Sequence, residues 1–194
     1  FSTYKSLGGP AGGLIVTNDK ALAEKLDAIA YPGLTANFDA AKTAALAITL
    51  QDWISCGTDY AEQMIATAQA LAHELDKKGL DIFGADKGFT TSHQFAIRAN
   101  KFGGGQTASK KLAKSGLLAC GINIPGEVVA GDNNAVRIGT PEIVRIGMKV
   151  SDMPKLAELI YRGLTENNFE QIKVDVKNFR KNFSGVHYTL DLPN

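Results

Sequence analysis

A lysine beside a glycine-rich turn is the first feature of the sequence that could do chemistry. Lys5 lies among the hydroxyl residues Ser2, Thr3 and Ser6, and glycines cluster over 8–13. An amine that forms a Schiff base must lose its proton next to a carbonyl group, and glycines let the backbone approach a bulky ligand. The nearby hydroxyls could bind phosphate oxygens. The turn lacks the GxxxxGK[ST] order of a P-loop, and a lysine in such a setting is most often a solvated surface residue.

An arginine at the end of a predicted strand is the second candidate. Arg137 lies in the segment 135–142, where Thr140 and Pro141 have the residue types of a helix N-cap and first helical position. An arginine at such a junction can hold a carboxylate through two parallel hydrogen bonds. A structural ion pair is the alternative, and spacing alone favours it.

Patterns of apolar residues predict the elements that position these side chains. Strands and helices alternate from 80 to 165, which predicts a small sheet covered by helices on one face. Asn18 or Asp19 is expected to cap the first helix, and Tyr31-Pro32-Gly33 to end it. The predicted strands are 14–16, 80–83, 94–98, 120–124 and 135–138; the predicted helices are about 19–30, 37–53, 59–78, 107–118, 151–165 and 169–183.

Composition indicates an ordinary soluble globular protein. The 194 residues carry a formal net charge of +1, which does not favour nucleic acid or an acidic membrane as a partner. The two cysteines, Cys56 and Cys120, fit no CxxC spacing, so neither a disulfide framework nor a metal site is predicted. A reducing cytoplasm is the simplest compartment, and no apolar run approaches the roughly 20 residues of a membrane span.

Taken together, these segments resemble serine hydroxymethyltransferases, which are fold-type I pyridoxal-phosphate enzymes. The family has its cofactor lysine in a Thr-rich stretch before a Gly-Pro-x-Gly-Gly turn and an apolar strand, as at Lys5 and 9–15. Its aromatic-Pro-Gly segment before an Ala-rich helix matches 31–33 and 40–47. Its Arg-[Val/Ile]-Gly-Thr-Pro motif matches 137–141. The order and spacing agree over about 1–165, so the resemblance implies an α/β fold.

The resemblance assigns a role to each candidate. Lys5 is implied to form a Schiff base with pyridoxal 5'-phosphate, and Arg137 to bind the carboxylate of the amino-acid substrate. Cofactor contacts are implied for a further set of residues: Ser2, Thr3, Tyr4, Gly33 and Thr35. His93 lies where the family has Asn-His before a strand, although a histidine bonded at a strand edge is the more common role. The implied activity is transfer of the hydroxymethyl group of serine, with tetrahydrofolate as acceptor, in one-carbon metabolism.

Three departures from the family pattern suggest a divergent branch. Tyr4 replaces the histidine that usually precedes the lysine, and a phenol does not titrate near neutral pH as an imidazole does. Residues 35–37 replace the family's Gly-Gly at the phosphate of the partner subunit. Residues 121–125 replace the Asn-rich loop that touches folate, and only Asn123 could serve there. Such a branch could act on α-methylserine or a related β-hydroxy amino acid.

The resemblance also implies a domain division and an assembly. Residues 1–57 would be the end of the cofactor-binding large domain with a connecting helix, and 58–194 the small C-terminal α/β domain. The family works as a homodimer. Because the family's pyridine-nitrogen partner lies upstream of the lysine, we expect this stretch alone to be inactive. Another fold-type I activity (threonine aldolase or aminotransferase) and a non-catalytic fragment are the alternatives.

Overall fold

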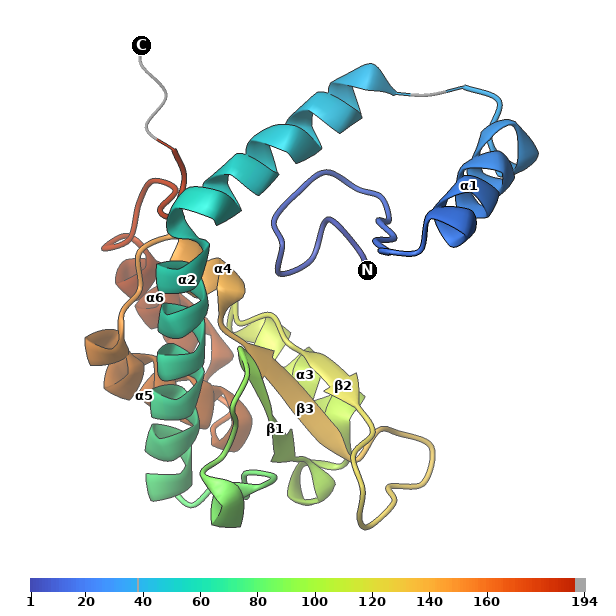
Figure 1. The fold of residues 1–194 in the computed structure, drawn as a ribbon. Coiled ribbons are helices and arrows are strands. Elements are labelled where there is room, and N and C mark those ends of the chain that lie inside the picture. The colour runs from blue at the N-terminus through green and yellow to red at the C-terminus, as the bar shows by residue number, and fades with distance from the viewer. Residues whose placement is uncertain (38, 191–194) are drawn as a thin grey trace. The chain divides into compact units, whose positions relative to one another are not determined.

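The computed structural model describes residues 1–37 and 39–190. The chain forms two compact units (Figure 1). The first contains residues 1–57 together with Thr189 and Leu190, and the second contains residues 58–188. The division between them falls inside a helix, between Gly57 and Thr58.

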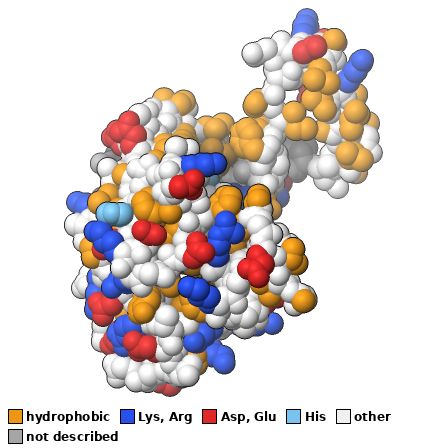
Figure 2. All heavy atoms as spheres, turned by 90° about the horizontal axis from the view of Figure 1, so that it is seen from below, with side chains coloured by type: hydrophobic (Ala, Val, Ile, Leu, Met, Phe, Trp, Pro, Cys, Tyr) orange, Lys and Arg blue, Asp and Glu red, His pale blue; other side chains and the backbone are white. Residues whose placement is uncertain are grey.

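The first unit begins with an irregular turn and then forms helix α1 (Lys20–Ala28). The Asp19 side chain accepts a hydrogen bond from the Leu22 backbone N–H at 3.0 Å, which confirms the predicted cap. The regular helix ends at Ala28, and the π-type turn η1 (Ile29–Leu34) follows with a non-helical Tyr31. Apolar side chains lie on the molecular surface among charges of both signs (Figure 2).

The predicted strand at 14–16 does not form. Ser2 and Gly13 make a single antiparallel bridge, and Leu14 exchanges backbone hydrogen bonds with Phe1 at 2.7 and 2.9 Å. Ile15 and Val16 are each 70% exposed. A strand requires a neighbour for its backbone groups, and the described residues offer none beyond Leu14.

One long helix, α2 (Ala40–Lys77), replaces the two helices predicted at 37–53 and 59–78. Gly57 lies inside this helix, and the Trp53 indole packs against it: a Cβ at Gly57 would be 2.7 Å from Trp53 Cε3. The Trp53 Nε1 donates to the Leu7 carbonyl at 2.7 Å. Although α2 has 38 residues, no helix in the described part of the chain is long and apolar enough to cross a membrane.

The second unit contains a three-stranded antiparallel sheet in the order β1-β3-β2. Its strands β1 (Gln94–Arg98), β2 (Cys120–Ile122) and β3 (Ala135–Gly139) confirm three of the predicted strands, with β2 ending two residues early. The predicted strand at 80–83 contributes only the bridge between Ile82 and Ile97.

Four further helices complete this unit. They are α3 (Gly105–Lys114), α4 (Pro141–Arg145), α5 (Met153–Thr165) and α6 (Phe169–Arg180). Three of them, α3, α5 and α6, agree with predicted helices within a few residues, and α4 begins at Pro141, where the sequence indicated a first helical position. The short 3-10 turns are η2 (Ala85–Lys87), η3 (Asn100–Phe102) and η4 (Val150–Asp152).

The hydrophobic core lies between one face of the sheet and these helices. Alternate residues of β1 and β3 point into it, which is the period-2 pattern of a sheet with one covered face. Helices α2, α3 and α5 supply the opposing side chains. The sheet residues are Phe95, Ile97, Val136 and Ile138, and the helix residues include Leu71, Leu75, Leu112, Leu156 and Ile160. The opposite face of β3 carries the exposed Arg137.

The carboxylate of Asp132, which lies outside helix α3, caps the first turn of that helix. Asp132 accepts hydrogen bonds from the backbone N–H groups of Gln106 and Thr107 at 2.8 and 3.0 Å, and from the Thr107 hydroxyl at 2.7 Å. These donors and the Asn133 N–H hold the pKa of the Asp132 carboxyl at about 2. Gly104 allows the close approach of Asp132, since a Cβ there would lie 2.4 Å from the Asp132 Cγ.

Candidate active site

The turn that carries Lys5 is fastened by Thr3. Thr3 is 2% exposed, and its backbone N–H donates to the Gly12 carbonyl at 3.1 Å while its carbonyl accepts from Gly9 N–H at 2.8 Å. Its hydroxyl donates to the Pro10 carbonyl. A Cβ at Gly9 would be 3.0 Å from the Thr3 carbonyl oxygen. The glycine-rich sequence therefore folds tightly around a buried threonine.

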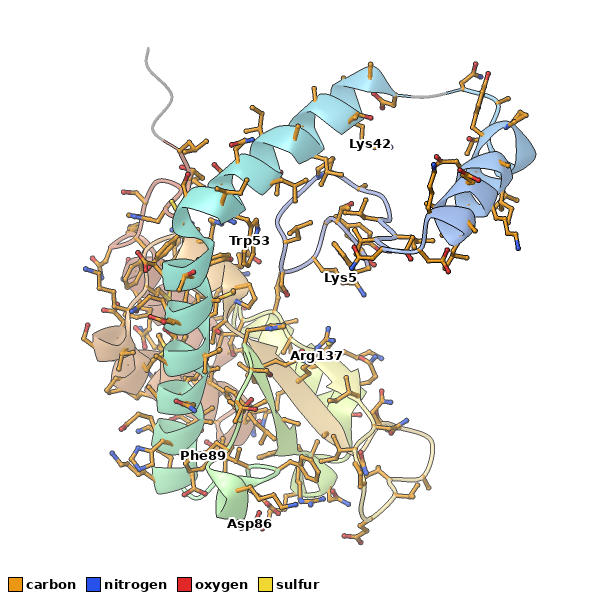
Figure 3. All side chains as sticks on the ribbon, viewed as in Figure 1. Lys5, Lys42, Trp53, Asp86, Phe89 and Arg137 are labelled. Atoms are coloured by element: carbon orange, nitrogen blue, oxygen red, sulfur yellow. The ribbon has the colours of Figure 1, made fainter. Side chains whose placement is uncertain are left out.

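This turn leaves the Lys5 side chain exposed (Figure 3). The Lys5 carbonyl accepts from Gly8 N–H at 2.8 Å. Within the described residues the Lys5 amine has no hydrogen-bond or ion-pair partner. Ser2 is half-buried beside it, and Tyr4 is 56% exposed. No side chain among the described residues therefore competes with a Schiff base at this amine.

The segment after α1 holds the other predicted cofactor contacts of this unit. Gly33 is exposed, and a Cβ there would lie 3.0 Å from the Ala28 carbonyl oxygen. The Thr35 hydroxyl and backbone N–H both donate to the Ala30 carbonyl, at 2.6 and 3.0 Å. In this conformation the Thr35 hydroxyl can offer a ligand its lone pairs but not its proton.

Arg137 lies in the middle of the central strand of the second unit. It pairs in register with Ala96 of β1 and with Cys120 of β2, so all three share the sheet face opposite the hydrophobic core. Its side chain is exposed (Figure 3). Among the described residues no ion pair or side-chain hydrogen bond engages the guanidinium, so the structural ion pair considered above has no partner there.

Arg137 borders a small cavity of about 230 Å³. Aromatic and aliphatic side chains form part of its wall, and hydroxyl and amide side chains form another part. Thr90 Oγ1 donates to the Gln94 carbonyl at 2.7 Å, which folds this wall against the start of β1. The residues around the cavity, besides Arg137, are Phe83, Phe89, Thr90, Ser92, Gln94, Phe95, Ala96 and Ile122.

These neighbours were not identified from the sequence. The alternation of side chains along β1 places Gln94 and Ala96 on the same face, and this is the sequence signal that could have identified them as neighbours of Arg137. No sequence signal indicated Phe89, whose backbone is left-handed at φ 70° although it is not glycine. His93 is half-buried beside the cavity wall, and its carbonyl accepts from Thr140 N–H at 3.0 Å.

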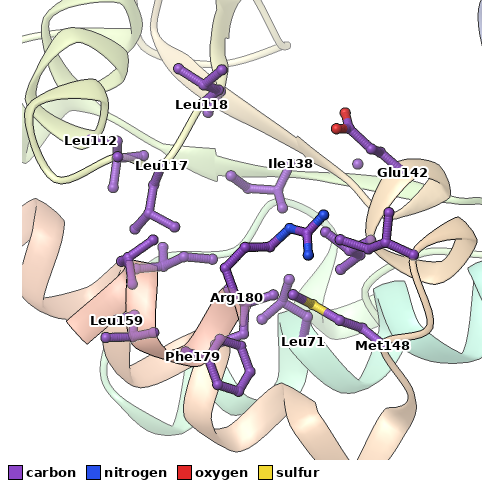
Figure 4. A pocket seen from close by; sticks show the side chains of 18 residues that line it. Leu71, Leu112, Leu117, Leu118, Ile138, Glu142, Met148, Leu159, Phe179 and Arg180 are labelled. Carbon is purple, nitrogen blue, oxygen red and sulfur yellow. The ribbon is translucent and has the colours of Figure 1, made fainter. Parts of the chain in front are cut away.

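A larger apolar cavity of about 330 Å³ lies on the helix-covered side of the sheet (Figure 4). Leu112, Ile138 and Phe179 are among its wall, and Glu142 and Arg180 are the charged residues that border it. It contains none of the candidate site residues. Since Ile138 and Arg137 are adjacent in β3 and point to opposite faces, this cavity is separate from the Arg137 site.

The first unit thus presents an exposed lysine on a Gly-rich turn, and the second unit presents an exposed arginine on a small antiparallel sheet. Comparison with known proteins identifies the class to which this arrangement belongs. The fold is that of the C-terminal portion of fold-type I pyridoxal-phosphate transferases, comprising the end of the large domain and the small α/β domain. The family model described as serine hydroxymethyltransferase matches residues 1–160. The chain belongs to the serine hydroxymethyltransferase family.

Its curated relatives fall into two groups. An α-methylserine aldolase of Variovorax paradoxus is 58% identical over 97% of this chain, and one of Ralstonia sp is 50% identical over 97%. A serine hydroxymethyltransferase of Sulfolobus acidocaldarius is 36% identical over 97% of the chain. The chain spans 42%, 43% and 44% of the length of these relatives, respectively.

A solved structure has the same fold. It is that of L-threonine transaldolase from Pseudomonas fluorescens in the internal aldimine state. The match has a TM-score of 0.83 at 26% identity, and it covers 98% of this chain and 44% of that one.

Proposed function

We propose that the complete protein cleaves or transfers the hydroxymethyl group of a serine-like amino acid, with α-methylserine as the preferred substrate class. The observation that carries the proposal is the exposed Lys5 amine, without a partner among the described residues, on a turn held by buried Thr3. The substrate class is supported by the relatives named α-methylserine aldolase, whose identity of 50–58% exceeds the 32–36% of the serine hydroxymethyltransferases.

Lys5 would hold pyridoxal 5'-phosphate through its amine, with Ser2, Thr3 and Tyr4 beside the cofactor. When bound, this cofactor supplies an electron sink for a carbanion at the substrate Cα. The proposed contribution of Thr3 is to fix the Lys5 turn, since its hydroxyl already donates to Pro10. Tyr4 is exposed and would offer a ring face or a phenol donor to the cofactor.

Arg137 would bind the substrate carboxylate. Its planar guanidinium can donate two parallel hydrogen bonds to a carboxylate, which fixes orientation as well as position. Fixing the carboxylate would orient the Cα–Cβ bond for cleavage, and proton transfer from the β-hydroxyl would then release an aldehyde. The first unit would represent the end of the large domain, and the second the small domain.

The assembly and the acceptor are further parts of this proposal. Gly33 and Thr35 would approach the cofactor of the partner subunit in a homodimer, and both are exposed in the structure. Cys56 and Cys120 are unpaired thiols, which supports a cytoplasmic location. Tetrahydrofolate is proposed as an optional acceptor that links the enzyme to one-carbon metabolism, with Asn123 as its contact.

The test is an assay of the complete protein with α-methylserine, L-serine and L-threonine, each with and without tetrahydrofolate. We expect α-methylserine to have the highest kcat/KM and its cleavage to proceed without folate. Folate-dependent turnover with serine as the best substrate would instead identify a hydroxymethyltransferase without the divergent specificity. With L-serine as the amino donor and pyruvate added, formation of alanine would identify an aminotransferase and contradict the proposal; with α-methylserine, alanine is the expected product of cleavage together with formaldehyde.

A further inference from the structure

Thr140, in the turn that follows β3, forms hydrogen bonds to α2 and to the residue that precedes β1. Its hydroxyl lies 2.7 Å from the Met64 carbonyl oxygen of α2 and 3.2 Å from the His93 carbonyl oxygen that precedes β1. Its backbone N–H also donates to the His93 carbonyl at 3.0 Å. Thr140 is fully buried, so water does not compete for these bonds. The predicted N-cap position is correct, but the hydroxyl bonds other elements instead of capping α4.

Tyr60 of α2 forms a hydrogen bond with Pro141, the residue after Thr140. Its phenol donates to the Pro141 carbonyl at 2.8 Å, and the side chain is 3% exposed. Burial raises the pKa of the Tyr60 phenol, although the adjacent Arg145 guanidinium lowers it. The phenol therefore stays protonated at neutral pH and can donate.

Arg145, at the end of α4, contacts the Tyr60 ring. The guanidinium carbon lies 4.4 Å from the Tyr60 ring centroid, which is a cation–π distance. The same guanidinium donates to the Tyr188 carbonyl at 2.8 Å, and the Tyr188 ring stacks on Tyr60 at 5.1 Å. Tyr60 is thus held by both a cation and an aromatic ring, which fixes the orientation of its phenol.

Arg137 lies at the point where β3 loses one of its two neighbours. Strand β2 pairs only with 135–137, and beyond Arg137 the strand is paired with β1 alone. Three residues later the chain reaches Thr140. The bonds made by Thr140 and Tyr60 replace the missing neighbour as the constraint on this end of β3.

We propose that Tyr60 and Thr140 are positioning residues for Arg137, which hold the end of β3 so that the guanidinium meets the substrate carboxylate in a two-bond geometry. This inference rests on the proposed function for the identity of the ligand. It assigns the two side chains no contact with substrate. Their effect is on the orientation of Arg137, and bidentate recognition is sensitive to displacements of about 0.5 Å.

The first experiment observes the Arg137 side chain directly by NMR and does not depend on catalytic turnover. In the complete holoenzyme, the Arg137 Nε–Hε NMR signal is assigned by its disappearance in Arg137→Lys. We expect that signal to move or broaden in Tyr60→Phe and Thr140→Val. Tyr161→Phe is the matched control, because Tyr161 lies in the same unit and its ring contacts Lys78. An unchanged Arg137 signal in both folded variants would overturn the inference.

The second experiment separates binding from chemistry. We expect Tyr60→Phe to raise KM for the amino acid about 3- to 10-fold, as for loss of one hydrogen bond, with kcat within twofold of wild type. Thr140→Val should have the same direction, and Thr140→Ser should restore KM because it keeps the hydroxyl. A fall in kcat with unchanged KM, or failure of Thr140→Ser to restore KM, would contradict a positioning role.

The two experiments separate failure of this inference from failure of the proposed function. If the wild type turns over no serine-like amino acid, the proposed function is wrong, and the Arg137 signal alone decides the positioning role. If the wild type is active and the signal does not change in the variants, the positioning role is wrong and the function stands.

Discussion

The Arg137 side chain is exposed, and no described residue forms an ion pair or a hydrogen bond with its guanidinium. Lysine at this position keeps the charge but cannot donate two parallel bonds to one carboxylate. We therefore expect Arg137→Lys to raise KM for the amino acid about 10-fold or more, the scale of one lost charge-assisted hydrogen bond. Steady-state kinetics of the complete protein measures this.

Arg98→Lys is the matched control for this change. Arg98 is also on the sheet, but it already has partners in the Asp81 carboxylate at 3.6 Å and the Pro125 carbonyl at 3.3 Å. We expect its substitution to leave KM within twofold of wild type. Equal effects of the two substitutions would show that Arg137 has no special part in carboxylate binding.

Cys120 gives an independent test of the same site. It pairs with Arg137 in register across β2 and β3, and its thiol is half-buried and unpaired. In a Cys56→Ser background, bound amino acid should slow alkylation of Cys120 by iodoacetamide, measured by mass spectrometry. Cys56, tested in a Cys120→Ser background, belongs to the first unit and should react at an unchanged rate. Equal rates for Cys120 with and without amino acid would place the ligand elsewhere.

At the residue scale, Lys5 and Arg137 were predicted as site residues from motifs that resemble those of a known family. The structure leaves both side chains exposed, and their roles stay predictions. Phe89 and Thr90, which help to form the cavity beside Arg137, lie in a loop whose path depends on a left-handed residue and on tertiary contacts. The sequence carries no periodic signal for such a path.

At the scale of elements, the start of helix α3 depends on one ionised carboxylate. The folded-state pKa of Asp132, about 2, is below its usual value near 3.8, so its bonds stabilise the fold above that usual value. This stabilisation is lost as the pH falls from about 4 toward 2. We expect Asp132→Ala to lower the unfolding temperature at pH 7, and the difference from wild type to shrink toward pH 2.

Thermal unfolding followed by circular dichroism at several pH values measures this difference. Asp86→Ala is a suitable control, because Asp86 is an exposed carboxylate in the turn η2 of the same unit. Its substitution should have a small effect at every pH. If the difference in unfolding temperature between wild type and Asp132→Ala stayed constant down to pH 2, the charge of the carboxylate would not be what stabilises the start of α3.

Elements with a clear hydrophobic period were predictable, and those decided by tertiary contacts were not. Strands β1 and β3 and helices α5 and α6 were predicted from pattern alone. The break predicted between the helices ending at 53 and beginning at 59 was wrong: α2 is continuous through this stretch, and Gly57 within it lets the Trp53 indole pack closely. The strand predicted at 14–16 was wrong because apolar residues form a strand only where a neighbour is available.

At the scale of the whole molecule, the two units differ in how much apolar surface they bury. Every buried hydrophobic residue among those described lies in 58–188, beginning at Tyr60. In the first unit the buried residues are Thr3, Thr49 and Gly57. Burial contributes about 25 cal/mol per Å² of apolar surface, whereas ordering the backbone costs about 1–2 kcal/mol per residue. The first unit therefore needs other surfaces to stabilise it.

Hydrogen exchange on a polypeptide of these 194 residues tests this difference. We expect fast exchange throughout 1–57 and strong protection in the core of 58–188. Leu71→Ala should destabilise the second unit by about 2–5 kcal/mol, since Leu71 is fully buried, without changing exchange in 1–57. Comparable protection in both units of the wild-type polypeptide would contradict this account.

The most direct test of the proposed function is the site of cofactor attachment in the complete protein. Borohydride reduces a carbon–nitrogen double bond between a lysine amine and the cofactor aldehyde, and peptide mass spectrometry then locates the modified lysine. We predict one phosphopyridoxyl group on the peptide that contains Lys5, and its loss in Lys5→Ala. Attachment at Lys20 or Lys42, or a wild-type protein that retains no cofactor after reduction, would contradict the account.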